Sequence, residues 1–194
     1  MADYNLYTHT VAGLIGIGLT GLFNASGLES ITLDESFPNS MGQFLQKVNI
    51  IKDFAEDLSE GRQFWPQRVW EQYTAEGEGL EAFVDPNNLE NALGCLNELC
   101  IDALQLVPDC LEYMSKLKNP SVIRCCAIPQ VVALASLSCV FNNRVIFGRK
   151  KFKLRYGLAA KIMFVFNHLM MSKKAIGSWL ETFSGRTGSV GLFT

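Results

Sequence analysis

Apolar positions recur every three to four residues along most of the chain, which is the spacing of one face of an α-helix. No alternating apolar–polar run is long enough to indicate a strand. The sequence therefore predicts an all-α fold, with long helices packed antiparallel around a shared centre. Helices are predicted over Leu6–Ala25, Ser40–Glu60, Pro66–Tyr73, Asp85–Lys118, Pro120–Val140 and Gly157–Leu180.

Turn and capping residues set the expected boundaries of these helices. Ser40 followed by Gln43 matches a capping box at a helix start, and Gly61 is a typical helix stop. Pro108 predicts a kink inside the Asp85–Lys118 helix. Surface connections are expected over Thr74–Phe83 and Asn142–Tyr156. The chain thus divides into one helical domain, residues 1–183, and a tail, residues 184–194, that is expected to be disordered.

Composition adds a domain class and a charge asymmetry. The 194 residues are 48% hydrophobic and 19% charged, as in a globular domain. Residues 1–112 carry 18 acidic and 4 basic side chains, whereas residues 113–194 carry 1 and 13. The first part therefore favours cations and the second favours phosphates. Two solvated faces that segregate by chance are the alternative interpretation.

Cysteine and apolar patterns exclude several classes of function. The six cysteines form no CxxC pair, which argues against zinc and favours free, mostly buried thiols in a reducing compartment. The apolar run Val11–Phe23 is too short to cross a membrane and is interrupted by glycines. No transmembrane segment is therefore expected. No nucleic acid partner is expected either, because no recognition motif accompanies the basic residues.

The most informative helix is Ser40–Glu60, because its polar residues form a stripe. Gln46, Asn49, Asp53 and Asp57 follow one another at spacings of three, four and four, and Glu56 borders the same stripe. Clustered carboxylates repel one another, so a bound cation would stabilise them by offsetting this repulsion. Mg²⁺ prefers one or two carboxylates together with water and phosphate oxygens. The stripe predicts half of a Mg²⁺–diphosphate site; a solvated face, with Lys47 and Lys52 as partners, is the alternative.

Three other segments are candidates for function. Tyr7 and His9 stand two residues apart, so one can point inward while the other bonds locally, and both can also be structural. Five bases from Arg149 to Arg155 suit a phosphate-rich cofactor, a membrane surface or plain solvent. Pro129, within Cys126–Gln130, is explained by an ordinary helix kink.

Several of these segments together resemble the squalene synthase family. The motifs are Y-x-H-x-VAGL at Tyr7–Leu14, SMG-x-FLQK-x-NII-x-D-x-x-ED at Ser40–Asp57, GR-x-FWP at Gly61–Pro66, CLNEL at Cys95–Leu99, CAIPQV at Cys126–Val131, and NN with K-x-R-x-G at Asn142–Gly157. Their order and spacing fit the family over roughly residues 3–162. Phytoene synthases share the fold and an Asp-rich helix, but the FLQK and CAIPQ stretches favour squalene synthase.

The resemblance implies a helical isoprenoid-synthase bundle around a central cavity. It implies condensation of two farnesyl diphosphates to presqualene diphosphate, followed by reduction with NADPH to squalene. Specific roles are implied at matching positions. Asp53, Glu56 and Asp57 would hold Mg²⁺ and diphosphate, Gln46 and Asn49 would line the same wall, Tyr7 would assist the first step, and Lys153 and Arg155 would contact NADPH.

The sequence also departs from the family pattern. The family's first Asp-rich motif has no counterpart here, so the bundle is expected to be incomplete and the chain inactive or poorly folded alone. Cys125 stands where the family usually has phenylalanine, which affects the reductive step. The alternatives are a truncated, non-catalytic product that binds isoprenoid diphosphate or a full-length partner, and phytoene synthase-like chemistry without NADPH. The family works on the cytosolic face of the endoplasmic reticulum membrane. Without the family's anchor, this chain is expected in the cytosol or at a membrane surface.

Overall fold

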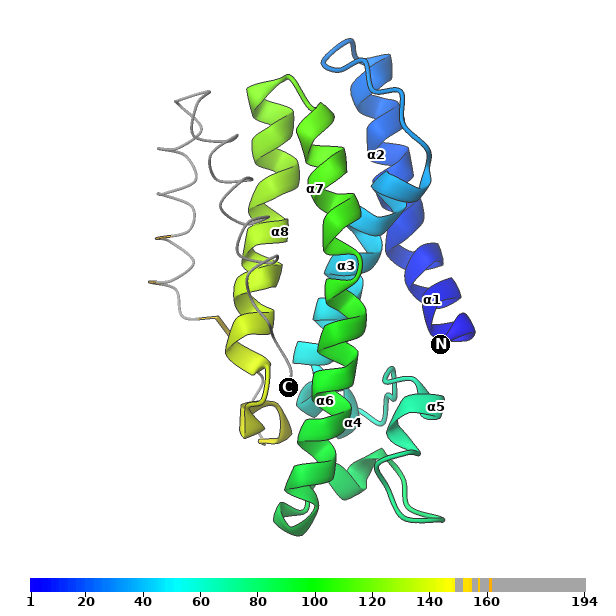
Figure 1. Cartoon of the computed structure of the whole chain (residues 1–194), viewed down its shortest axis with the longest axis vertical. Coiled ribbons are helices and arrows are strands. Elements are labelled where there is room, and N and C mark those ends of the chain that lie inside the picture. The colour runs from blue at the N-terminus through cyan, green and yellow to red at the C-terminus, as the bar shows by residue number, and fades with distance from the viewer. Residues whose placement is uncertain (149–151, 155–156, 158–160, 162–194) are drawn as a thin grey trace.

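The computed structural model describes residues 1–148, 152–154, 157 and 161, and these residues form helices and turns with no strand among them. Figure 1 shows the long helices running roughly side by side, with α6 and α7 nearly end to end and α8 alongside. The elements are α1 (Ala2–Thr8), the π-helix η1 (His9–Gly13), α2 (Leu14–Ala25), α3 (Ser36–Lys52), α4 (Phe54–Ser59), α5 (Gln67–Trp70), the 3₁₀ turns η2 (Leu80–Val84) and η3 (Pro86–Asn88), α6 (Leu89–Leu104), α7 (Val107–Lys116), α8 (Pro120–Val140) and the 3₁₀ turn η4 (Arg144–Phe147).

Helix α3 is the centre of the bundle, because it packs against α2 and η1 on one side and against α6, α7 and α8 on the other. Phe44, Val48 and Ile51 are at most 2% exposed. The apolar side predicted for this helix is therefore confirmed. The approach of η1 is close enough that a Cβ added at Gly42 would lie 2.0 Å from the Ala12 carbonyl oxygen.

The predicted start of α3 at Ser40 is wrong, since the helix begins at Ser36. Pro38 fits into the first turn, where backbone N–H groups have no helical partner. The Asp34 carboxylate accepts a bond from the Ser36 N–H at 2.9 Å. Ser40 and Gln43 form no capping box: the Ser40 hydroxyl donates to Asp109 at 2.8 Å, and Gln43 reaches the α1 backbone.

The predicted continuous helix to Glu60 is also wrong. Asp53 leaves helical geometry, with φ −92° and ψ 8°, so α3 ends at Lys52 and the short α4 follows. Gly61 does terminate α4, with φ +71°, as predicted. The chain then turns back so that the Arg62 N–H donates to the Asp57 carbonyl at 2.8 Å. This return of the chain places Arg62 beside the carboxylate stripe.

The other boundaries agree in part with the predictions. The first helix ends at Ala25 as expected but begins at Ala2. Pro108 does not kink one helix; it lies in the first turn of α7, after a break at Gln105–Leu106, because it cannot donate to a preceding turn. The helix Pro120–Val140 is confirmed. The predicted helix Gly157–Leu180 and the tail Ser184–Thr194 lie outside the described residues, apart from Gly157 and Lys161.

An aromatic cluster fixes the segments around the end of α3. The rings of Phe54, Trp65, Phe83 and Phe147 lie with centroids 4.7–6.2 Å apart. The Trp65 indole also donates to the Ile50 carbonyl at 3.2 Å. Phe83 and Phe147 come from segments that were predicted as surface connections, and both are buried. Apolar burial, which contributes roughly 25 cal/mol per Å², recruits these loops into the core.

Two described helices are long and apolar enough to cross a membrane by length and composition alone. They are the continuous helix Ala2–Ala25 and α8, and 33% of the apolar window of α8 is buried inside the bundle. The first helix, Ala2–Ala25, is longer than the apolar run Val11–Phe23 on which the expectation rested. The absence of a transmembrane segment therefore stays a prediction.

Candidate functional site

A pocket of about 250 Å³ lies where α1 approaches the end of α3, and it brings together most of the predicted site residues. Gln46 and Asn49 come from α3, Asp53 and Asp57 from the break and from α4, and Tyr7 from α1. These five residues were predicted from the stripe and from the family resemblance. The lining is completed by residues that sequence reasoning did not assign to the site: Ile50, Arg62 and Phe64.

The break at Asp53 changes the shape of the stripe without dispersing it. One continuous helix would keep Gln46, Asn49, Asp53 and Asp57 in a straight row. In the structure α4 starts anew at Phe54, yet Asp53 and Asp57 still line the same pocket. Glu56 is half-buried and does not line it. The pocket therefore receives two carboxylates, and the role of Glu56 stays a prediction.

Cationic side chains accompany both carboxylates. Lys52 Nζ lies 3.0 Å from Asp53 Oδ2, and Arg62 Nη2 lies 2.9 Å from Asp57 Oδ1. Arg62 also donates to Glu60. The bond to Asp57 raises the pKa of the Arg62 guanidinium above its ordinary value, so this group remains charged. Lys52 and Lys47 were the partners expected if the stripe were a solvated face; Lys52 does contact the stripe, whereas Lys47 is buried and bonds to Asp102.

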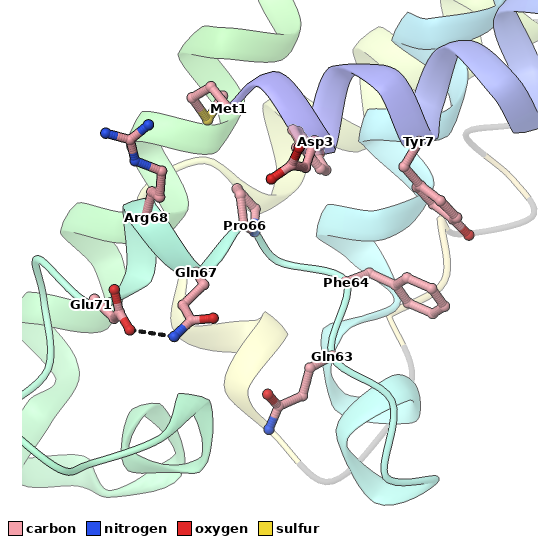
Figure 2. Close-up of a pocket in the computed structure, with 10 residues that line it drawn as sticks. Met1, Asp3, Tyr7, Gln63, Phe64, Pro66, Gln67, Arg68 and Glu71 are labelled. Carbon is pink, nitrogen blue, oxygen red and sulfur yellow. Dashed lines mark hydrogen bonds between the residues drawn. The ribbon is translucent and has the colours of Figure 1, made fainter.

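Tyr7 forms one edge of the pocket. Its ring stacks on that of Phe64, with centroids 5.6 Å apart and planes 22° apart. The same two rings border a second pocket of about 430 Å³, which is lined by both tyrosines of α1 and by the segment Gln63–Glu71. Figure 2 shows Tyr7 and Phe64 together at one edge of this second pocket. Tyr7 therefore lies between the two pockets, and the residue is 38% exposed.

His9 and the CAIPQ segment have structural contacts. His9 Nδ1 and Asn39 Oδ1 are 2.8 Å apart, so the histidine joins η1 to α3 while Tyr7 faces the pocket. Gln130 is buried and donates from Nε2 to the Met41 carbonyl at 2.9 Å. The preceding Cys125 is exposed. The expectation of free cysteines holds, and three of the six are fully buried.

Of the two predicted cofactor contacts, the structure describes Lys153 alone. Lys153 is described and exposed, and it does not line the pocket. Arg155 lies outside the described residues. No group of three or more metal-binding side chains occurs within the described part of the chain. Two carboxylates nevertheless fit Mg²⁺, which usually keeps waters and completes its ligands with phosphate oxygens.

Arg62 and Phe64 are the residues that sequence reasoning missed, although a signal was present. Both belong to the GR-x-FWP motif that follows the helix stop at Gly61. The positive φ of Gly61 reverses the chain, so a residue five positions after Asp57 returns to bond with it. A glycine stop directly followed by arginine, close to a carboxylate pair, was the available clue.

Comparisons with known proteins match most of this chain to one family. The squalene/phytoene synthase family matches residues 1–155. Squalene synthase from Rattus norvegicus is 47% identical over 181 residues, which are 92% of this chain and 42% of that protein. Squalene synthase 8 from Panax ginseng is 47% identical over 164 residues, covering 83% of this chain and 41% of that protein.

The fold is shared as well. A solved complex of TcSQS with the ligand BPH1237 superposes with a TM-score of 0.84 at 43% identity, covering 99% of this chain and 55% of that one. The predicted all-α isoprenoid-synthase fold is thereby confirmed. The chain spans less than half the length of the curated relatives it matches.

Proposed function

Because this chain belongs to the squalene/phytoene synthase family, we propose that it supplies one wall of a Mg²⁺-dependent site for farnesyl diphosphate. The observation that carries the proposal is the pocket that joins Tyr7 to Gln46, Asn49, Asp53 and Asp57. In the proposed reaction, two farnesyl diphosphates condense head to head to presqualene diphosphate. Reduction of that intermediate with NADPH then gives squalene, as part of isoprenoid and sterol biosynthesis.

The carboxylates would hold the metal. Asp53 and Asp57 are the two pocket residues with anionic oxygens, and their side chains are 22% and 13% exposed. Mg²⁺, when bound, neutralises the charge that develops on a departing diphosphate. Gln46 and Asn49 would donate amide N–H bonds to phosphate oxygens from the same wall. The pocket thus offers both the anionic and the neutral polar groups that such a ligand uses.

Arg62 adds a cationic partner for the diphosphate. Its guanidinium now donates to Asp57 through Nε and Nη2, at 3.1 and 2.9 Å. Guanidinium groups bind carboxylate and phosphate oxygens with the same forked geometry. We propose that Arg62 exchanges Asp57 for a phosphate oxygen when the carboxylate turns to the metal. The side chain is 44% exposed, so the exchange requires little desolvation.

Tyr7 would act on the carbon skeleton of the substrate rather than on its diphosphate. Its ring and that of Phe64 present aromatic surface beside the pocket, and aromatic faces attract cations by ~0.5–2 kcal/mol. We propose that Tyr7 assists the first step, as a base or as a stabiliser of the carbocation. We propose that Lys153 and Arg155 contact the phosphate of NADPH, as the family resemblance implies.

The test is calorimetric titration of the purified chain with Mg²⁺ and inorganic pyrophosphate, and then with farnesyl diphosphate. Asp53→Asn and Asp57→Asn each remove a charged contact worth about 1.5–3 kcal/mol. Binding should therefore weaken roughly 10- to 150-fold. Glu112→Gln, on the exposed surface of α7, is the matched control and should bind like the parent. Equal binding by all three variants would refute the proposal.

A second candidate function is pairing with another polypeptide. Apolar side chains on α1, η1 and α2 are exposed: Leu6 by 63%, Ile15 by 59% and Leu22 by 65%. No charged residue occurs between Asp3 and Glu29. A contiguous apolar face of this kind marks an interaction site. Binding of a longer family member, measured by light scattering and abolished in Ile15→Glu, would support this function; unchanged binding would remove it.

We also propose that the chain works in the cytosol or at the cytosolic surface of the endoplasmic reticulum membrane. The support is the family resemblance together with the exposed apolar face of α2. Flotation with neutral lipid vesicles tests this location. Recovery of the parent with the vesicles, and of Ile15→Glu in the soluble fraction, is the expected result. Recovery of both proteins in the soluble fraction would place the chain in the cytosol alone.

A further inference from the structure

Lys47 is a charged side chain buried in the centre of the bundle and not used by the proposed site. It is 3% exposed, and its Nζ donates to Asp102 Oδ2 at 2.6 Å. Asp102 belongs to α6. Gln46, the preceding residue, lines the pocket. Neighbouring helical residues point about 100° apart, so α3 presents the site on one side and this ion pair on another.

The same ammonium group contacts α1. Nζ lies 5.3 Å from the centroid of the Tyr4 ring, and Tyr4 is 6% exposed. The Tyr4 hydroxyl has no hydrogen-bond partner among the described residues. Burial, and next the Asp102 carboxylate, raise the pKa of this phenol above its ordinary value. The ring of Tyr4, rather than its hydroxyl, is therefore what holds this part of α1.

Few other side chains of α1 itself are buried. Among Ala2–Thr8 only Tyr4 and Thr8 are buried, and the other five residues are exposed. The Asn5 carbonyl accepts a bond from Gln43 Nε2 at 2.9 Å, which is a second link from α3. Tyr4 and Tyr7 are three residues apart, so they are neighbours on one side of the helix. A displacement of Tyr4 consequently moves Tyr7.

We propose that Lys47, with Asp102 and Tyr4, is a positioning residue that sets where the Tyr7 ring stands over the carboxylate pocket. We call these three residues the Lys47 hub. Its meaning for catalysis rests on the function proposed for Tyr7. Its geometric effect on Tyr7 does not, and can be tested without any ligand.

An apolar core would stabilise the bundle equally well. Replacing both partners of a buried ion pair by apolar residues of similar volume is often neutral or stabilising. In some proteins a buried pair instead specifies one arrangement of its helices. In this chain the pair fixes α6 to α3, and the cation–π contact then extends this single arrangement to α1.

The experiment places a fluorinated tyrosine at position 7 by site-specific incorporation and records its fluorine NMR signal. The test variant is Lys47→Met with Asp102→Leu, which removes both charges. The control is Lys116→Met with Glu112→Leu, which removes an exposed ion pair on α7. Circular dichroism and urea unfolding establish that each variant is folded.

The hub variant is expected to fold while its Tyr7 signal shifts toward that of free fluorotyrosine, because the stack on Phe64 is lost. The control should keep the parental signal. An unchanged Tyr7 signal in the folded hub variant overturns the proposal. If that variant does not fold, Tyr4→Met, which keeps the ion pair and removes the ring, is judged by the same signal.

Titration of the parent with Mg²⁺ and pyrophosphate separates this inference from the proposed function. If the hub variant shows a shifted Tyr7 signal but the parent does not bind pyrophosphate, the hub is supported and the diphosphate site is refuted. If the parent binds pyrophosphate but the hub variant keeps the parental Tyr7 signal, the site is supported and the hub is refuted.

Discussion

Two ion pairs near helix α3 differ in the exposure of their cations: Lys47 of α3 pairs with Asp102 of α6, and Arg62, in the loop after α4, pairs with Asp57 of α4. Lys47 and Asp102 meet at 2.6 Å with Lys47 3% exposed, whereas Arg62 meets Asp57 at 2.9 Å with the arginine 44% exposed. The first pair joins α3 to α6 in the core, and the cation–π contact of Lys47 with Tyr4 adds α1. The second joins a loop to a carboxylate at the mouth of a pocket. A buried pair resists exchange because either charge alone is costly, whereas an exposed pair can change partners readily.

Removing one partner of the buried pair should have the largest effect. Lys47→Ala leaves Asp102 without its cation and opens a cavity beside Tyr4. The free energy of unfolding should fall by about 3–5 kcal/mol. Urea unfolding followed by circular dichroism measures this loss. A loss as small as that of a surface pair would show that the two ion pairs do not differ in their contribution to stability.

The second-largest effect is expected at alkaline pH, where the buried cysteines should lower the stability of the fold. Burial raises the pKa of the Cys100 and Cys110 thiols from 9.0 to about 12. A group whose pKa is raised on folding stabilises the protein below its unfolded pKa, and this stabilisation is lost as pH rises from about 9 to about 12. At pH 10 the loss is on the order of 1 kcal/mol for each thiol.

Unfolding in urea at pH 8 and pH 10 tests this expectation. The Cys100→Ala, Cys110→Ala variant should lose less stability between the two values than the parent. Equal losses in both proteins would mean that the buried thiols do not set the alkaline limit.

A close helix contact gives the third prediction. At Gly42→Ala the new methyl group would lie 2.0 Å from the Ala12 carbonyl oxygen, so η1 must move away from α3. Overpacking of this kind costs about 1–3 kcal/mol. Gly18→Ala is the control, since its methyl group meets no atom within 4 Å. Thermal unfolding should show a lower midpoint for Gly42→Ala only; equal midpoints would mean that η1 yields without cost.

The exposed pair should contribute least to stability. Arg62→Gln removes a contact that is open to solvent, and pairs of this kind contribute about 0–1 kcal/mol. The same change removes the proposed phosphate contact, so Mg²⁺–pyrophosphate binding should weaken while unfolding stays nearly unchanged. Calorimetry and urea unfolding on one preparation separate the two. A large loss of stability with unchanged binding would reverse the roles assigned to the two pairs.

The helical periodicity was sufficient to predict the architecture and much of the pocket. Gln46, Asn49, Asp53 and Asp57 were placed together by spacing, and they remain together although the helix breaks at Asp53. Spacing along one helix is local information, so it survives a change in helix length. The side on which the stripe lies was therefore predictable from the sequence.

What the sequence did not predict depends on contacts between distant segments. Ser40 and Gln43 look like a cap in isolation, yet Asp109 and the Asn5 carbonyl compete for their side chains. Lys47 looks like a surface lysine until α6 brings Asp102 beside it. Phe83 and Phe147 lie in polar loops and are buried because their rings meet Trp65. These outcomes follow from tertiary packing, which single-residue tendencies do not contain.

Because of the π-helical turn His9–Gly13, the position of Tyr7 depends on how many residues this turn contains as well as on which residues they are. A π-turn accommodates one residue more than an α-helical turn, and each residue of an α-helix rotates the chain by about 100°. Deleting a single residue from His9–Gly13 would rewind the turn and swing both Tyr4 and Tyr7 to another side of the helix. An insertion or deletion here would therefore move Tyr7 away from the pocket without any change at residue 7 itself.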